Sequence, residues 1–345
     1  MHNYKKLFLP DYKNIKVLKV LSNKEIKNID KGYNLTPLYI FKKKLKNVLI
    51  LTLKKSGLIS FFKISMPRSL DSVHSKYEKI AGSYIKDHKN SDKLKFIAIN
   101  EKNKIIECKG LITNYYAACL KKLYILFKSK SVLEVGAGEL TTIDELLGKL
   151  KKSKKTPKKI GAIDISLKRL IEGKKFSDKK RRNIKLIARA DASKLPFPDN
   201  SFDMVYTANC LEQVPELFSK SIKELVRVSS NLIVIIEPSY EFGSDSSRKN
   251  IFKKGYTRIN DNHFKKLGLK PIYRNKLELR YYISGTEIII LKKNKIKKNI
   301  NKSDYICPSS HKNLYRNGSV YSTKNKDINY KIKNSIPLLC EGDKV

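Results

Sequence analysis

Apolar residues follow two alternating patterns along the middle of the chain. Between residues 111 and 127 they recur every three or four positions, which predicts an amphipathic helix. Short runs of valine, isoleucine and leucine follow, and each run predicts a buried strand. These runs are 131–135, 160–165, 184–188, 202–206 and 231–236, with two further candidates at 271–274 and 286–291.

Segments with helical spacing lie between these runs. The first is 140–150, where Thr141 or Thr142 is expected to cap the helix. The next starts at 167–172, and 215–228 opens with a proline, which suits the first turn of a helix. This alternation predicts an α/β fold, a doubly wound, mostly parallel, seven-stranded Rossmann-like sheet with helices on both faces.

The two ends of the chain follow other patterns. Up to about residue 110, apolar runs cut by Lys and Asn predict an N-terminal extension of unspecified fold; the runs are 38–41, 48–53, 58–64 and 96–99. A Lys- and Asn-rich linker leads to residues 303–345, which predict a small β-rich module. At about 100–200 residues per domain, we expect divisions at 1–110, 111–293 and 303–345.

The charge balance allows two kinds of polyanionic partner. Lys and Arg number 74 against 32 Asp and Glu, a net charge of +42, which suits nucleic acid or an anionic membrane. Lys greatly outnumbers Arg, the residue that makes bidentate phosphate and guanine contacts. Compositional bias therefore explains the charge better. A nucleic-acid partner stays open but is not favoured, and so does a basic surface segment at 47–66.

Cysteine usage and hydropathy indicate the compartment. The five cysteines are odd in number and widely spaced, so they form no disulfide framework and favour a reducing cytoplasm. No apolar run approaches the 18 or so uncharged residues of a membrane-spanning helix. The first ten residues lack the apolar core of a signal peptide. We expect a cytoplasmic protein.

The first predicted strand ends in a glycine-containing turn. Glu134, Gly136 and Gly138 follow one another at this end, where ligands bind in doubly wound sheets. Glycines let the backbone turn sharply and approach a ligand closely, and the helix that follows attracts anionic groups at its N-terminus. A single Gly-x-Gly also occurs in ordinary tight turns.

The next two strand ends carry carboxylates. Asp164 ends the second strand, where a carboxylate can accept hydrogen bonds from both hydroxyls of a ribose; it could instead cap a helix. The third strand leads to Asp191 and Ala192. A side-chain acceptor beside a backbone N–H matches the amine and a ring nitrogen of adenine, although an isolated Asp is more often a turn residue.

Together these segments resemble the class I S-adenosylmethionine-dependent methyltransferases, specifically the small-molecule family often called type 11. The matching segments, in order, are 132–138, 161–166, 191–197, 201–206 and 211–214. The resemblance covers roughly residues 111–293 and implies S-adenosylmethionine as cofactor. An NAD(P) oxidoreductase is disfavoured, because Thr141 stands where a third small residue would be wanted.

The resemblance also implies roles for individual residues. Glu134, Gly136 and Gly138 would line the methionine end of the cofactor, Asp164 would hold the ribose, Asp191 and Ala192 the adenine, and Asn209 would lie near the methionine moiety. Two positions depart from the family pattern. Leu140 replaces the third glycine of the longer motif, and Gln213 replaces the frequent histidine, so a base at that position is not expected.

The acceptor side carries no diagnostic catalytic group. Methyl transfer mainly requires that the nucleophile be positioned, and we leave the catalytic base unassigned. Side chains near the predicted strand ends are candidates for acceptor binding: Tyr115, Tyr116, Glu237, Tyr240 and His263. The alternative for the tyrosines is a place in the core or rim, and for His263 a place on the surface.

The tail resembles the small zinc-ribbon-related domain of the tRNA-methyltransferase-activator type. The resemblance rests on Cys307-Pro308 and on residues 330–339. Ser310 stands where zinc-binding relatives have a second cysteine, and Cys307, His311 and Cys340 are too poorly spaced for a closed tetrahedral site. We therefore expect no bound metal.

We expect a methyltransferase that acts on a small-molecule or glycan-type acceptor. The first alternative is a methyltransferase of RNA or of a translation protein, which the charge and the tail would suit. The second, from another class, is a module that binds the cofactor without turnover. The sequence leaves open the acceptor, the methylated atom, the oligomeric state and the role of residues 1–110.

Overall fold

The computed structural model describes residues 4–12, 14–31, 68–294 and 303–345. The runs at 38–41, 48–53 and 58–64 and the basic segment 47–66 lie outside the described residues. Within the described ranges, no helix is both long enough and apolar enough to span a bilayer.

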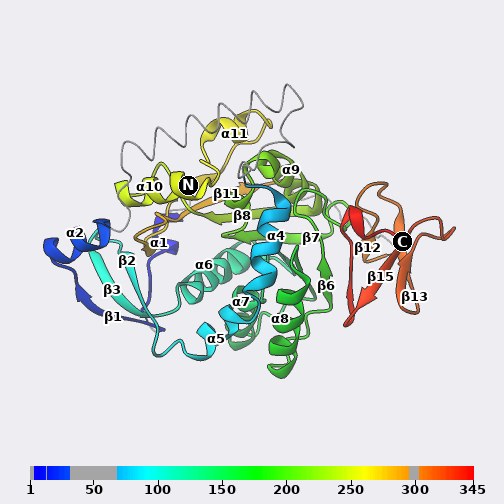
Figure 1. Cartoon of the computed structure of the whole chain (residues 1–345), viewed down its shortest axis with the longest axis horizontal. Helices are drawn as coiled ribbons and strands as arrows, with labels where there is room; N and C mark the ends of the chain where they lie inside the picture. The colour runs from blue at the N-terminus through cyan, green and yellow to red at the C-terminus, as the bar shows by residue number, and fades with distance from the viewer. Residues whose placement is uncertain (1–3, 13, 32–67, 295–302) are drawn as a thin grey trace, which may run out of the picture.

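A seven-stranded sheet forms the centre of the molecule (Figure 1). Its order is β6-β5-β4-β7-β8-β11-β9; the first five strands are parallel, and β11 runs antiparallel to both neighbours. This confirms the predicted doubly wound sheet. The strands are β4 (Ser131–Val135), β5 (Lys159–Asp164), β6 (Leu186–Arg189), β7 (Phe202–Ala208), β8 (Ser229–Glu237), β9 (Tyr273–Lys276) and β11 (Glu287–Lys292).

Helices cover both faces of this sheet. Side chains alternate along β4, so that Val132 packs with one core cluster, whereas Leu133 and Val135 pack with the other. The first cluster includes residues of α6 (Ile112–Leu126), α7 (Thr141–Lys152) and α8 (Leu167–Lys179), and the second includes residues of α9 (Phe218–Val228) and α11 (Asp261–Lys265). A further helix, α10 (Asp245–Lys254), follows β8.

Two helix starts differ from expectation. Neither Thr141 nor Thr142 caps α7, because Leu140 occupies the N-cap position with φ 57° and makes no side-chain cap. Glu134 on β4 replaces the cap instead, and its Oε2 accepts a hydrogen bond from the Ile143 N–H at 3.1 Å. The segment 215–228 opens with one 3₁₀ turn, Pro215–Leu217, before α9 begins.

The N-terminal region packs onto the central part rather than standing apart. Its strands β1 (Ile15–Val20), β2 (Lys95–Ile99) and β3 (Ile105–Gly110) form an antiparallel sheet of order β1-β3-β2-β10 with β10 (Arg280–Tyr281). Helix α4 (Leu70–Lys79) packs on α8, and α5 (Ser83–Lys89) packs on α7 and α8. Two short helices, α1 (Tyr4–Leu7) and α2 (Asn23–Lys31), flank β1.

The C-terminal residues form the β-rich module that the pattern predicts. Its five strands lie in chain order: β12 (Tyr305–Ile306), β13 (Asn313–Asn317), β14 (Val320–Ser322), β15 (Asn329–Lys333) and β16 (Ile336–Pro337). Figure 1 shows the module at the β6 end of the molecule. The Leu339 N–H donates to the Arg189 carbonyl at 2.8 Å, and Leu338 bridges Arg189 in parallel. The module thus docks by backbone pairing on the edge of the central sheet.

Candidate functional site

A cavity of about 410 Å³ opens at the carboxyl ends of β4, β5, β6 and β7. Six residues that the sequence predicted for one ligand line it together: Glu134, Gly136, Asp164, Asp191, Ala192 and Asn209. Gly138, the seventh, contacts this group through its N–H, which donates to Asp164 Oδ2 at 2.8 Å. The strand ends therefore gather these side chains at one place, as the fold requires.

The glycine turn after β4 is tight in both conformation and space. Gly136 and Gly138 have φ values of 77° and 52°, which L side chains rarely adopt. A Cβ at Gly136 would overlap Cys210 Sγ, and a Cβ at Gly138 would overlap the guanidinium of Arg169. Both glycines are therefore needed for the loop to close against its neighbours.

The carboxylates at the next two strand ends differ in how many hydrogen bonds they accept from the protein. Asp164 accepts the Gly138 N–H through Oδ2 and the Ser166 N–H through Oδ1, each at 2.8 Å. Asp191 accepts the Ser193 N–H through Oδ1 at 2.8 Å. Among the described residues, neither Asp191 Oδ2 nor the Ala192 N–H has a hydrogen-bond partner. An acceptor and a donor thus stand free side by side.

Glu134 brings a nearly neutral carboxyl group into the cavity wall. It is 2% exposed, and burial raises its pKa to about 8. At neutral pH most of this carboxyl therefore holds its proton. A cation placed beside it would favour the ionised form.

A second carboxyl pair lies behind the loop that follows β7. Glu237 accepts the Thr207 hydroxyl at 2.9 Å and the Leu211 N–H at 3.1 Å. Burial and the neighbouring Glu212 carboxyl raise the pKa of Glu237 well above its ordinary range. Glu237 thus holds the loop in place, whereas Glu212 and Gln213 line the cavity.

The five predicted acceptor-side candidates lie elsewhere. The Tyr115 hydroxyl donates to the Phe8 carbonyl, and the Tyr116 hydroxyl bonds Thr286 Oγ1 at 3.2 Å, both in the core. His263 packs edge-on against Phe218, and Tyr240 packs under Arg248 and Arg258.

None of these five residues, Glu237 included, belongs to the described residues that line the cavity. Their roles stay predictions.

Several cavity residues were not predicted from the sequence. They come from α4, α5, α8, the loop after β7, and α10 with the residues just after it, and include Tyr77, Tyr84, Arg169, Glu212, Lys254 and Tyr256. Tyr77 and Tyr84 are seven residues apart at helical spacing, but they fall in the region whose fold the pattern does not specify. Only the contact with Arg169 reveals their place.

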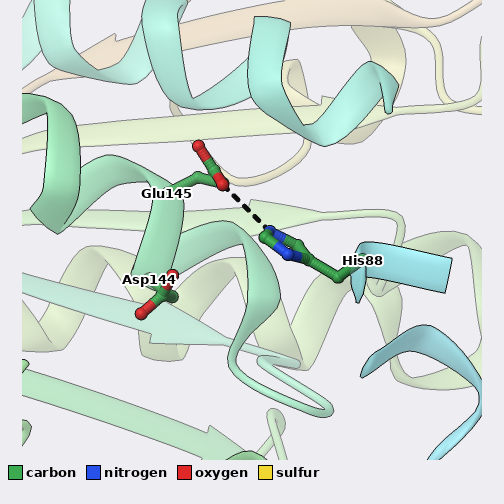
Figure 2. A group of neighbouring side chains, drawn as sticks. All are labelled: His88, Asp144 and Glu145. Atoms are coloured by element: carbon green, nitrogen blue, oxygen red, sulfur yellow. Dashed lines mark ion pairs between the residues drawn. The ribbon is translucent and has the colours of Figure 1, made fainter. Parts of the chain in front are cut away.

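One cluster of His, Asp and Glu has metal-like spacing in the described ranges (Figure 2). His88 Nε2 lies 2.9 Å from Glu145 Oε1, while the two oxygens of Asp144 bond Lys180 and Arg182 at 2.8 Å each. The two cations already neutralise Asp144, so this cluster is a poor cation site. Cys307, His311 and Cys340 do not gather into such a cluster in the described ranges, and their lack of metal stays a prediction.

A comparison with protein-family models identifies the central part of the chain. Residues 133–231 match the model described as a methyltransferase domain. This span runs from β4 to the start of β8 and contains the glycine turn, Asp164 and Asp191. The chain therefore contains a methyltransferase domain, whose methyl donor is S-adenosylmethionine.

Several solved structures are similar to half of this chain or more. The cyclase SpnF has 14% identity and a TM-score of 0.46, and covers 66% of this chain and 97% of its own. An S-adenosylmethionine-dependent methyltransferase from Aquifex aeolicus has 19% identity and a TM-score of 0.39, over 50% of this chain and 88% of its own.

Magnesium protoporphyrin IX methyltransferase from Synechocystis PCC 6803 has 14% identity and a TM-score of 0.39, over 52% and 79% of the two chains. A search of curated proteins found none that matches. These likenesses carry no conclusion about the acceptor.

Proposed function

We propose that this protein binds S-adenosylmethionine in the 410 Å³ cavity and methylates a small-molecule or glycan-type acceptor there. The observation that carries the proposal is the free pair of Asp191 Oδ2 and Ala192 N–H, one strand away from Asp164. An acceptor beside a donor fits the amine and ring nitrogen of adenine, and Asp164 on the adjacent strand fits the ribose.

The other residues of the cavity have roles that follow from their positions. Gly136 and Gly138 let the loop after β4 close against Cys210 and Arg169, and Glu134 and Asn209 lie at the β4–β7 end of the cavity, where the methionine part would lie. S-adenosylmethionine supplies an electrophilic methyl group when bound. The chain's own task is then to orient the donor and the acceptor and to keep water out.

The acceptor would bind against the remaining wall. That wall is largely apolar and aromatic and includes Leu70, Val73, Ile112, Tyr256 and Tyr281. The donor takes up much of the cavity volume, which supports a small acceptor or a single group of a larger one. We assign no catalytic base, because no candidate touches a defined acceptor.

An RNA acceptor is the second candidate. It is supported by the net charge of +42 and by a second cavity, of about 620 Å³, that shares Thr113 with the first. Its basic lining residues are Lys16, Lys109, Lys149, Lys152 and Arg182. RNA binding that weakens steeply with salt would favour this candidate over the first.

Calorimetric titration with S-adenosylhomocysteine tests the donor site. The wild type should bind, and Asp164→Asn should bind about 10- to 100-fold more weakly, since it loses a charge-assisted hydrogen bond. Asp164 also accepts two backbone N–H groups, so the unfolding midpoint of the variant must be measured alongside.

Asp178→Asn provides the matched control, because Asp178 lies on α8 with a half-exposed side chain. It should leave the affinity unchanged. If the wild type failed to bind S-adenosylhomocysteine, the proposed function would be wrong.

A further inference from the structure

Arg169 places a buried guanidinium at the wall of the cavity. It lies in the first turn of α8 and is 8% exposed. Its guanidinium carbon is 4.9 Å from the ring centre of Tyr77 and 4.5 Å from that of Tyr84, and the group lies against Gly138. Helices α4 and α5 thus hold the cation beside the glycine turn.

The guanidinium has one carboxylate as counter-ion but donates no hydrogen bond to the described residues. Arg169 Nε is buried without a hydrogen-bond partner in the described part of the chain. Nε forms an ion pair with the buried Glu139, whose Oε1 lies 3.5 Å away and whose Oε2 accepts the Ile85 N–H at 2.8 Å. Nη1 and Nη2 are not among the buried atoms without a partner, and neither donates a hydrogen bond to the described residues, so these two nitrogens are the donors open to a ligand. The guanidinium carbon lies over the rings of Tyr77 and Tyr84, which supply cation–π contacts rather than hydrogen bonds.

A buried cation with unused donors is costly unless an acceptor meets it. The guanidinium offers donors alone, in a planar fork that matches a carboxylate with two parallel hydrogen bonds. The adenine amine and the ribose hydroxyls are donors that suit Asp191 and Asp164. The carboxylate of the methionine part is the one anionic group that S-adenosylmethionine carries.

We infer that Arg169 binds the carboxylate of the methyl donor, and that Tyr77 and Tyr84 position its guanidinium for this contact. The inference rests on the function proposed above. It also gives α4 and α5, which lie outside the matched span 133–231, a part in donor binding. Tyr77 and Tyr84 act through Arg169 and are positioning residues.

A pair of ligands that differ by the carboxylate alone tests this inference. S-adenosylhomocysteine and its decarboxylated form, which keeps the amine, are titrated calorimetrically into the full-length wild type and Arg169→Met. The wild type should prefer S-adenosylhomocysteine by tenfold or more. Arg169→Met should lose about tenfold in affinity for S-adenosylhomocysteine and almost none for the decarboxylated ligand. The ratio of the two affinities should therefore fall toward one.

Further variants separate charge from fit. Arg169→Lys keeps the charge without the fork and should retain part of the preference. Lys168→Met, which removes the neighbouring exposed cation, should retain all of it. Tyr84→Leu should reduce the preference, whereas Tyr84→Phe, which keeps the ring, should not.

The outcomes distinguish this inference from the proposed function. If Arg169→Met weakens both ligands equally, or neither, Arg169 does not bind the carboxylate and the inference is overturned, while the donor site stands. If the wild type binds neither ligand, the proposed function fails first, and the inference fails with it. Should Arg169→Met not fold, an undiminished preference in both Arg169→Lys and Tyr84→Leu would likewise overturn the inference.

Discussion

The cavity and the docking edge of the C-terminal module treat their polar groups in opposite ways. At the edge, Arg189 pairs with Asp343, Lys194 pairs with Glu341, and the Leu339 N–H meets the Arg189 carbonyl. In the cavity wall, Arg169 Nε and the Ala192 N–H make no hydrogen bond with the described residues, although Arg169 Nε lies 3.5 Å from Glu139 Oε1.

Unpaired polar groups cost stability where they are buried, and the proposed ligand would supply partners for those in the cavity wall. The docking edge, by contrast, is complete without one. Changes at the edge should therefore alter the free energy of unfolding and leave donor affinity alone. Changes in the cavity wall should lower donor affinity.

The largest effect is expected at the docking edge from Tyr305→Ala. Tyr305 is 2% exposed and stacks on Phe197 of the central part with ring centres 5.5 Å apart. Removing its ring should lower the free energy of unfolding by about 3–5 kcal/mol, the usual cost of deleting a buried aromatic side chain. Urea denaturation measures this loss.

The matched control is Tyr315→Ala, in the same module but 39% exposed. It should change the free energy of unfolding by less than about 0.5 kcal/mol. Below the unfolding transition, Tyr305→Ala should bind S-adenosylhomocysteine as the wild type does. A parallel loss of affinity would mean that the module shapes the cavity, and the comparison would break down.

The sequence predicts the fold better than it predicts the site. Strand β4 lies where the pattern places it, because a central strand of a parallel sheet is apolar on both faces. Helix α10 was missed because its sequence, with four basic residues and two serines, shows no apolar stripe. The N-cap of α7 was misassigned because Glu134, on a different element, supplies the hydrogen bond.

Within the site, too, some residues could be predicted from the sequence and others could not. Asp164 and Asp191 could be predicted because their places depend only on the order of strands and on the rule that ligands bind at strand ends. Arg169, Tyr77 and Tyr84 could not, because they meet through tertiary packing of α4 and α5 on α8. Tyr115 and Tyr116 illustrate the converse, since helical spacing did not distinguish the core side of α6 from the cavity side.

A smaller effect is expected in the cavity wall, where Glu134 should release a proton when ligand binds. Burial raises its pKa to about 8, and the cationic amine of S-adenosylhomocysteine should favour the ionised form. Calorimetry at pH 7 in buffers of different ionisation enthalpy should show net proton release in the wild type. Glu134→Gln should show none, and should bind about tenfold more weakly.

The pKa of Glu134 also predicts how the free energy of unfolding changes with pH. The folded-state pKa of Glu134 lies above the ordinary value of 4.5 for a glutamate, so the unfolded chain ionises first as the pH rises. This group therefore lowers the free energy of unfolding progressively between about pH 5 and pH 8. Glu134→Gln should flatten that part of the pH profile; an unchanged profile would mean that Glu134 is ionised in the free protein.

The smallest effect is expected in the C-terminal module, at Cys307. Burial alone would raise the pKa of this thiol, but hydrogen bonds with Ser309, Ser310 and Tyr330 lower it to about 6. Burial raises the pKa of the other cysteines, to about 11 in Cys108, about 12 in Cys119 and Cys340, and well above the usual value in Cys210.

A step in thiolate absorbance below pH 8 should therefore come from Cys307 alone. Tyr330→Phe should move the midpoint of this step upward, because it removes one hydroxyl partner, 3.3 Å away.

Because the pKa of Cys307 is lower in the folded than in the unfolded protein, its thiolate adds stability as the pH rises from about 6 to 9, and this stability is lost as the pH falls through 6. Tyr330→Phe should reduce that gain by about 1 kcal/mol or less, and Tyr321→Phe, on the neighbouring strand, should not change it. A midpoint that stays in place would show that Tyr330 does not stabilise the thiolate, and that the polar groups of the module are less completely paired than its docking edge suggests.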